Sequence, residues 1–223
     1  MTALTVLQLD THFPRVAGDV GSPHSYLEVP QIIRVPGAGV AGIVTDRPQD
    51  IDITPFQDAL AQAHGDLVVT SCGFLAPWQD HLAAQTDRPF IASALSALDD
   101  LAQFFTPSEV LIVTFDAARL GAAHLGQHAD FAGSICGLPP DMHLRRVIEG
   151  DSDTLDTARA TQDLVGLLQT HVDPVAHRHI LLECTNLPPY APALRATFGL
   201  AVTDVLTCIE RARPGTVKPR FLA

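Results

Sequence analysis

Short apolar runs that alternate with helical patterns are the feature of this sequence that most constrains its fold. The runs are rich in Val, Ile and Leu and are mostly continuous, as strands buried on both faces of a parallel sheet are. The alternation with helices predicts an α/β fold with parallel sheets. The expected strands are residues 4–10, 31–35, 66–71, 89–93, 109–115, 143–148, 179–183 and 200–206.

Four stretches between or after these runs have the pattern of helices. In the first, Thr54 is placed to cap the helix, Pro55 suits the first helical position, and Gly65 stops it. In the second, leucines recur at helical spacing on one face. The predicted helices cover residues 54–65, 93–105, 153–172 and 188–199.

Two segments half a chain apart share one plan. Residues 66–84 and 179–197 each lead from a polar residue through an apolar strand to a cysteine, and then through a proline into a helix. Sites of open α/β sheets lie at the carboxyl ends of strands, where these cysteines stand. We therefore predict two similar halves, each a parallel sheet flanked by helices with one cysteine at the carboxyl end of a strand. The expected lobes are residues 1–95 with 209–223, carrying Cys72, and residues 96–208, carrying Cys184.

Composition limits the possible partners and the compartment. Of 223 residues, 47% are hydrophobic and 17% charged, which is enough apolar material for a sizeable core. The net charge of −11 and the lack of a basic cluster argue against a nucleic acid or a membrane surface as partner. Residues 1–15 lack the pattern of a signal peptide, so we expect a cytoplasmic protein whose four cysteines are free thiols.

The chemistry of the two matched cysteines is that of an acid/base pair. A thiol at a strand-to-helix junction lies near backbone N–H donors, which favour the thiolate. Two such thiols facing one substrate carbon make Cys72 and Cys184 the catalytic candidates. The alternative is that both are unreactive core residues, since Cys is among the most buried residue types. Cys136 and Cys208 lack the shared plan and are expected to be structural.

The residues flanking the two cysteines are candidates for binding the substrate. Thr185 and Asn186 follow the second cysteine and, with nearby N–H groups, are suited to hold a carboxylate. Ser71 precedes the first cysteine, whereas Gly73 and Phe74 follow it. The first half of the site is therefore expected to be less polar than the second.

Three further candidates come from strand ends and from the loop after the first strand. Asp10 ends that strand, and Arg15 lies in the loop that follows, where it is suited to pair with a substrate carboxylate. Thr114 ends the strand at 109–115 and is placed to contact the same ligand. The alternatives are an ordinary surface loop for the first two and a structural hydroxyl for Thr114.

Other motifs point to no cofactor or metal. The "GAGVAG" of residues 37–42 has the G-x-G-x-x-G spacing of a dinucleotide site, but no helical pattern follows it. His124 with His128, and His177 with His179, have spacings that metals accept but lack a third ligand motif. We therefore expect neither a metal nor a cofactor.

At the two cysteines the sequence resembles the aspartate/glutamate/hydantoin racemase superfamily. The resemblance rests on "TSCGF" around Cys72, "ECTNLPP" around Cys184 and "LQLDTHFPRVAGDVGSP" near the start. The second motif is similar to the Cys-Thr-His-Phe-Pro of glutamate racemases, whereas Gly73 and Phe74 depart from the Cys-Asn-Thr of those enzymes. The "GDVGSP" and "SCGF" segments also resemble the branch that includes algal-type dimethylsulfoniopropionate lyases.

The resemblance implies two pseudo-symmetric α/β lobes with the active site in the interlobe cleft. It also implies a cofactor-independent enzyme that acts on a small carboxylate and forms a homodimer or higher homo-oligomer. Our first expectation is a racemase or epimerase of an amino acid or related carboxylate. One thiolate removes the proton α to the carboxylate, and the opposite thiol returns a proton. The alternatives are a decarboxylase, a binding protein on the same fold, and a lyase that eliminates dimethylsulfide. In a lyase, Phe74, Trp78 or Tyr26 would face the sulfonium through cation–π attraction.

Overall fold

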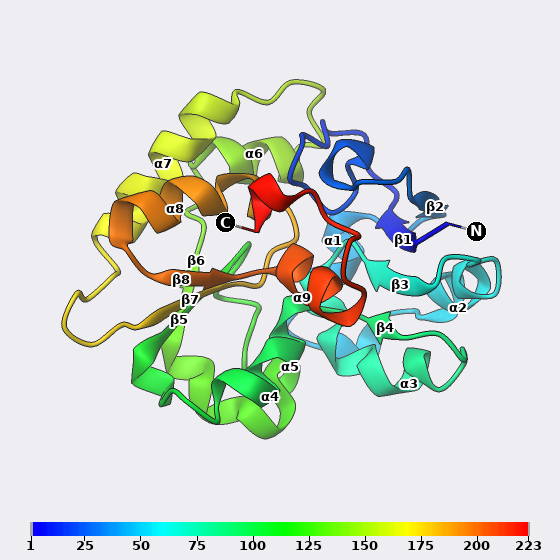
Figure 1. Cartoon of the computed structure of the whole chain (residues 1–223), viewed down its shortest axis with the longest axis horizontal. Helices are drawn as coiled ribbons and strands as arrows, with labels where there is room; N and C mark the ends of the chain where they lie inside the picture. The colour runs from blue at the N-terminus through cyan, green and yellow to red at the C-terminus, as the bar shows by residue number, and fades with distance from the viewer. Residues whose placement is uncertain (1, 223) are drawn as a thin grey trace.

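The protein, a computed structural model that describes residues 2–222, is built on two four-stranded parallel sheets (Figure 1). The first sheet has the order β2-β1-β3-β4, and the second has the order β6-β5-β7-β8. The strands of the first are β1 (Leu4–Leu9), β2 (Gln31–Val35), β3 (Leu67–Thr70) and β4 (Phe90–Ile91). Those of the second are β5 (Val110–Thr114), β6 (Ile135–Gly137), β7 (His179–Leu182) and β8 (Ala201–Thr203).

The two sheets repeat one topology, which confirms the predicted two-lobe α/β fold. In each sheet the first strand of the chain lies between the second and the third. Cys72 follows β3 and Cys184 follows β7, so each comes after the third strand of its sheet. The lobe boundaries expected above stay a prediction, because the sheets fix only where the strands lie.

Helices and 3-10 turns connect the strands and cover the sheets (Figure 1). The α-helices are α1 (Val40–Ile43), α2 (Thr54–Leu60), α3 (Gln79–Ala83), α4 (Leu98–Leu101), α5 (Ala122–Leu125), α6 (His143–Glu149), α7 (Thr157–Gln169), α8 (Ala191–Phe198) and α9 (Val205–Ala212). The 3-10 helices are η1 (Pro23–Ser25), η2 (Pro48–Asp50), η3 (Gly73–Trp78), η4 (Ala94–Ala97), η5 (Pro107–Glu109), η6 (Gly126–Ser134), η7 (Pro188–Tyr190) and η8 (Pro219–Phe221).

Seven of the eight expected strands form, and the eighth is wrong. Residues 143–148 belong to helix α6, because Leu144, Val147 and Ile148 are buried at the three- and four-residue spacing of a helix face. The strand that takes the vacant place is β6, which has only three residues and carries Cys136. Its run is too short for periodicity to separate it from a loop.

The predicted helices exist with shifted ends. Thr54 is the first residue of α2 rather than its cap. The helix expected from residue 153 begins as α7 after Asp156, whose carboxylate accepts a hydrogen bond from the Arg159 N–H. The segment that follows "GAGVAG" is loop with the short turn η2, as expected, and the single-turn helix α1 lies within the motif and ends one residue past it.

The C-terminal segment returns to the first sheet after the second one is complete. Helix α9 lies between the two sheets and contacts β3 (Figure 1). The Leu27 N–H donates to the Thr216 carbonyl at 3.0 Å, and the Lys218 N–H donates to the Ser25 carbonyl at 3.0 Å. The chain end therefore supports the loop of residues 10–28, which lies over the edge of the sheets.

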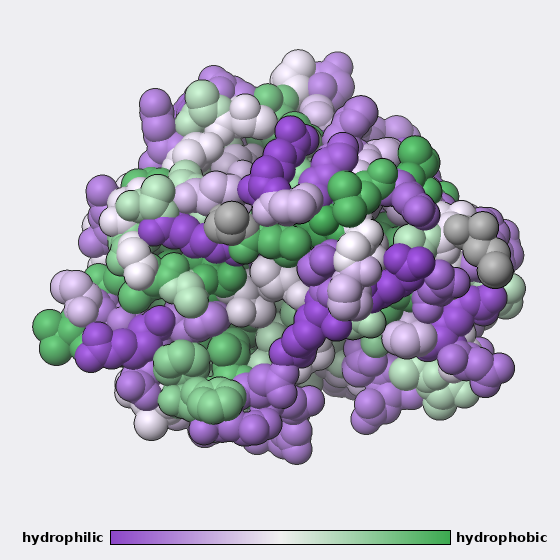
Figure 2. Space-filling model, in the orientation of Figure 1, coloured by the Kyte–Doolittle hydropathy of each residue, from purple (hydrophilic) through white to green (hydrophobic). Residues whose placement is uncertain are grey.

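The apolar side chains form a core around both sheets. All residues of β1, β3, β5 and β7 are buried, as strands covered on both faces require. The face seen in Figure 2 mixes hydrophilic side chains with small apolar patches. Among residues 2–222 no helix is long and apolar enough to cross a bilayer.

Candidate active site

The carboxyl ends of the two sheets meet around a small cavity of about 20 Å³ that both cysteines line. A cavity of this size holds about one water molecule. Its lining includes eight of the ten residues predicted from the sequence: Arg15, Ser71, Cys72, Gly73, Phe74, Cys184, Thr185 and Asn186. The remaining lining residues are Leu9, Phe13, Val40, Val44, Phe115, Ile148 and Glu183.

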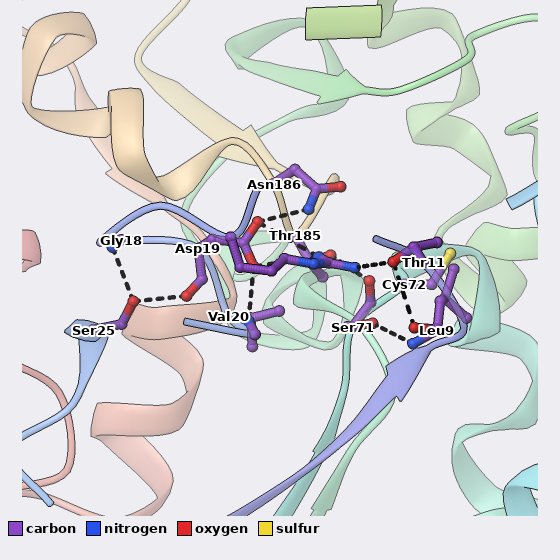
Figure 3. Close-up of polar contacts among 12 residues, drawn as sticks. Leu9, Thr11, Gly18, Asp19, Val20, Ser25, Ser71, Cys72, Thr185 and Asn186 are labelled. Atoms are coloured by element: carbon purple, nitrogen blue, oxygen red, sulfur yellow. Dashed lines mark hydrogen bonds and ion pairs between the residues drawn. The ribbon is translucent and has the colours of Figure 1, made fainter. Parts of the chain in front are cut away.

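Each cysteine stands at a corner where a fully buried strand stops. Cys72 has extended backbone and precedes the turn η3, and Cys184 follows β7 by two residues. The thiols are 7% and 6% exposed, respectively. The two corners are joined directly, since the Thr185 hydroxyl donates to the Ser71 carbonyl at 2.6 Å. The Ser71 hydroxyl in turn accepts from the Leu9 N–H at 2.9 Å (Figure 3).

The loop after β1 brings a cation and an anion to the second cysteine. The Asp19 carboxylate accepts a hydrogen bond from the Asn186 amide at 2.7 Å (Figure 3). It also lies 3.3 Å from the Arg15 guanidinium. Arg15 also donates to the Thr11 hydroxyl at 2.9 Å. These contacts fix the Asn186 side chain, whose Oδ1 lies 3.8 Å from the Cys184 sulfur.

The same loop is held in place by contacts on both sides of the cavity. Gly18 has φ +102°, and a Cβ there would come within 2.7 Å of the Pro189 Cα, so this position requires glycine. Ser25 accepts from the Gly18 N–H and donates to the Asp19 carbonyl (Figure 3). The backbone N–H of Phe13 donates to the Asp151 carboxylate at 2.9 Å. A ligand larger than water therefore enters only if part of this wall moves.

Glu183 is the one ionisable lining residue that the sequence reasoning missed. It is fully buried between β7 and Cys184. Its Oε2 accepts a hydrogen bond from the Thr114 hydroxyl at 2.6 Å, while its Oε1 has no hydrogen-bond partner within residues 2–222. The sequence held one signal for this residue, the acid that ends the apolar run "ILLEC". Acids are rarely buried at the end of an apolar strand, because burial of a charge is costly.

Burial and the Glu183 charge determine the protonation of the two thiols. Desolvation, followed by the Glu183 charge, raises the pKa of Cys72 to about 12, although the Phe74 N–H and Arg15 oppose the change. Desolvation and Glu183 also raise the pKa of Cys184 well above its ordinary value. Desolvation raises the pKa of Glu183 to about 7, against the Thr114 hydrogen bond. Burial and the Glu183 charge thus both favour the neutral thiol form of each cysteine.

Two predicted binding residues lie outside the cavity lining. Asp10 points to the first sheet's outer turn, where it accepts from the Gly37 N–H at 3.2 Å and pairs with Arg34 at 3.8 Å. Asp10 directly follows β1, but its side chain points to solvent and is 37% exposed. Thr114 is fully buried behind the cavity, where its hydroxyl orients Glu183 instead of facing a ligand.

The remaining cysteines and histidines lie apart from this cavity. Cys136 is buried in β6 and Cys208 in α9. His128 pairs with Asp99, and His179 contacts the Thr203 hydroxyl. Within residues 2–222, no three His, Cys, Asp or Glu side chains are arranged to hold a metal ion. The expectation of a cofactor-free enzyme stays a prediction.

Known proteins resemble this chain over nearly its whole length. No protein-family model matches it. A dimethylsulfoniopropionate lyase of Durusdinium sp. clade D is 31% identical over 244 residues, which cover 98% of this chain and 77% of the relative. Dimethylsulfoniopropionate lyase 7 of Emiliania huxleyi (strain CCMP1516) is 30% identical over 92% of this chain and 64% of its own length.

Solved structures share the fold at low sequence identity. Allantoin racemase from Pseudomonas fluorescens has a TM-score of 0.64 at 14% identity, over 94% of this chain and 88% of that one. Arylmalonate decarboxylase has a TM-score of 0.56 at 17% identity, over 97% and 96%. Glutamate racemase RacE1 from Bacillus anthracis has a TM-score of 0.53 at 14% identity, over 97% and 84%. The solved structures show a fold shared with racemases and a decarboxylase, and the Durusdinium relative shows that the chain belongs to the dimethylsulfoniopropionate lyase family.

Proposed function

We propose that this protein is a lyase that removes the proton α to a carboxylate and eliminates dimethylsulfide from dimethylsulfoniopropionate. The observation that carries the proposal is the convergence of Cys72 and Cys184 on one buried cavity, in a chain whose sequence relatives are named as lyases of that substrate. In that cavity a thiolate of either cysteine is shielded from water, which strengthens it as a base.

The elimination needs one base. A thiolate takes a proton from C2 of the substrate, and the electrons of that C–H bond form the C2–C3 double bond. The C3–S bond breaks, and its electron pair leaves with the sulfur as dimethylsulfide. Acrylate and a neutral thiol remain, so atoms and charge balance. The proton at C2 is weakly acidic, and donors at the carboxylate must stabilise the charge that develops there.

Cavity residues supply both those donors and an apolar surface. Arg15 is a cation beside the site, and its Nε finds no hydrogen-bond partner within residues 2–222. With Thr185 and Asn186, we assign it to the substrate carboxylate. Phe74 and Phe115 also line the cavity and suit the sulfonium through cation–π attraction. Trp78 and Tyr26 are outside this lining, with their polar atoms bonded to backbone carbonyls.

A racemase or epimerase of a small carboxylate is the second candidate. The presence of two thiols favours it, because inversion needs an acid on one face and a base on the other. Asp10 lies outside the cavity lining and is therefore not placed to hold the ammonium group of an amino-acid substrate. The lyase needs no such group.

Single-cysteine variants separate the two reactions. Purified protein is incubated with dimethylsulfoniopropionate while dimethylsulfide is measured, and with single enantiomers of amino acids in heavy water. For the lyase, one of Cys72→Ser and Cys184→Ser abolishes dimethylsulfide release and the other reduces it less. For the racemase, deuterium enters at Cα with inversion and both variants are inactive. Cys136→Ser is the matched control, since that thiol is buried in β6 away from the lining.

A further inference from the structure

Glu183 occupies the point of the cavity that both cysteine corners share. It precedes Cys184 in the chain, and its carboxyl packs directly against the backbone that follows Cys72. A Cβ added at Gly73 would lie 2.0 Å from the Glu183 Oε1, closer than any real contact. The carboxyl oxygen without a hydrogen-bond partner in the described chain is therefore the one turned toward the first thiol's corner.

The carboxyl is oriented by a residue that does nothing else in the site. The Thr114 hydroxyl donates to Oε2 at 2.6 Å from the neighbouring strand β5. A buried carboxyl oxygen without a hydrogen-bond partner is costly to keep. Oε1 is free to accept a proton or a hydrogen bond from a thiol.

Burial and mutual repulsion disfavour more than one ionised group among Glu183 and the two thiols. An ionised Glu183 opposes ionisation of both Cys72 and Cys184, and burial opposes all three. Arg15 favours the Cys72 thiolate, whereas Asp19 disfavours the Cys184 thiolate. Behind Phe115, Arg145 and Asp116 neutralise each other as an ion pair at 2.8 Å.

We infer that Glu183 is the proton acceptor that generates the catalytic thiolate. The inference rests on the proposed lyase function and deepens it. The S–H bond of a cysteine breaks, an O–H bond forms at Oε1, and the total charge of the cavity stays the same. After the elimination, the thiol holds the substrate's C2 proton. Glu183 releases its own proton to water and then accepts this one, so that each turnover releases one proton.

The test compares Glu183→Gln with Glu183→Asp, because the first removes the acid and the second retains it. Dimethylsulfide release is measured from pH 5 to 10. Alkylation of Cys72 and Cys184 by iodoacetamide is followed over the same range by peptide mass spectrometry, which does not depend on lyase activity. In the wild type, both activity and alkylation should rise through the Glu183 pKa of about 7.

For Glu183→Gln we expect dimethylsulfide release at pH 7 to fall about 100-fold, as loss of a general base does. The activity of this variant should recover at alkaline pH. The midpoint of its pH profile should lie at least about 1.5 units above that of the wild type, since an unperturbed thiol has a pKa of about 8.5 and burial raises it further. The alkylation step near neutrality should vanish. Glu183→Asp should keep a midpoint within about one unit of the wild type.

A Glu183→Gln protein whose activity falls equally at every pH, with its alkylation step intact, would overturn the inference. A wild-type protein that releases no dimethylsulfide would overturn the proposed function instead. In that case the alkylation profiles still decide whether Glu183 takes the thiol proton.

Discussion

The Thr185 hydroxyl donates a 2.6 Å hydrogen bond to the Ser71 carbonyl, although the two residues are 114 positions apart in the chain. Each residue is next to a cysteine, so this one contact links the corner after β3 to the corner after β7. Both partners are buried. The relative placement of the two thiols therefore depends on a hydrogen bond between the sheets.

Thr185→Val should loosen that link. The substitution removes the donor and leaves the Ser71 carbonyl buried without a partner, which costs about 1–3 kcal/mol. We expect that loss in the free energy of unfolding by urea, with slower dimethylsulfide release. Thr185→Ser keeps the hydroxyl and is the matched control. Equal stability and activity for the Val and Ser variants would show that the bond does not hold the corners together.

Neutral substitution should raise KM at Arg15 but leave KM unchanged at Asp10. Arg15→Gln removes the cation assigned to the substrate carboxylate, and a charge-assisted hydrogen bond is worth about 1.5–3 kcal/mol. We therefore expect KM for dimethylsulfoniopropionate to rise about 10- to 100-fold. Asp10→Asn alters only an exposed pair with Arg34 and should leave KM unchanged. A larger effect at Asp10 than at Arg15 would place the carboxylate site elsewhere.

Gly73→Ala should disturb Glu183 more than any other part of the chain. The new Cβ would meet the Glu183 carboxyl at 2.0 Å and its backbone carbonyl at 2.6 Å. Overpacking of this kind costs about 1–3 kcal/mol, and the displaced carboxyl should slow catalysis at least about tenfold. Gly42→Ala in α1 is the control, because its Cβ meets nothing within 4 Å. A fully active Gly73→Ala protein would contradict the tight packing described here.

The buried Glu183 should make the protein less stable as pH rises. Its pKa is raised by burial from 4.5 to about 7, so its favourable contribution is complete below pH 4.5 and is lost as pH rises through 7. A shift of this size corresponds to about 3 kcal/mol. Glu183→Gln should therefore match the wild type near pH 4.5 and exceed its unfolding free energy at pH 8. A difference that is independent of pH would mean that the pKa of Glu183 is the same in the folded and the unfolded protein.

The fold and most of the cavity lining could be predicted because they follow from local patterns. Continuous apolar runs identify buried parallel strands, and the shared plan around Cys72 and Cys184 places both at carboxyl ends. The neighbours of the two cysteines could then be predicted as cavity residues, because they are adjacent to them in the chain. Arg15 was found because a loop after β1 must pass over the same edge.

The errors lie where tertiary contacts decide. Helices α1 and α6 contact each other across the cavity and supply Val40 and Ile148 to its lining, yet their short runs resemble loop and strand. Asp10 and Thr114 were wrongly expected to face the ligand, because a strand end fixes a residue's position but not the direction of its side chain. The Asp10 side chain points to solvent, and the Thr114 hydroxyl points to Glu183. Glu183 was missed since only the fold shows which atoms surround a buried acid.

The most direct test of this account measures dimethylsulfide released from dimethylsulfoniopropionate by the purified wild-type protein and by Cys72→Ser, Cys184→Ser and Cys136→Ser. We predict release by the wild type and the Cys136 variant, and a loss of about 100-fold or more in one of the two cavity variants. Release at the wild-type rate by both cavity variants would contradict it.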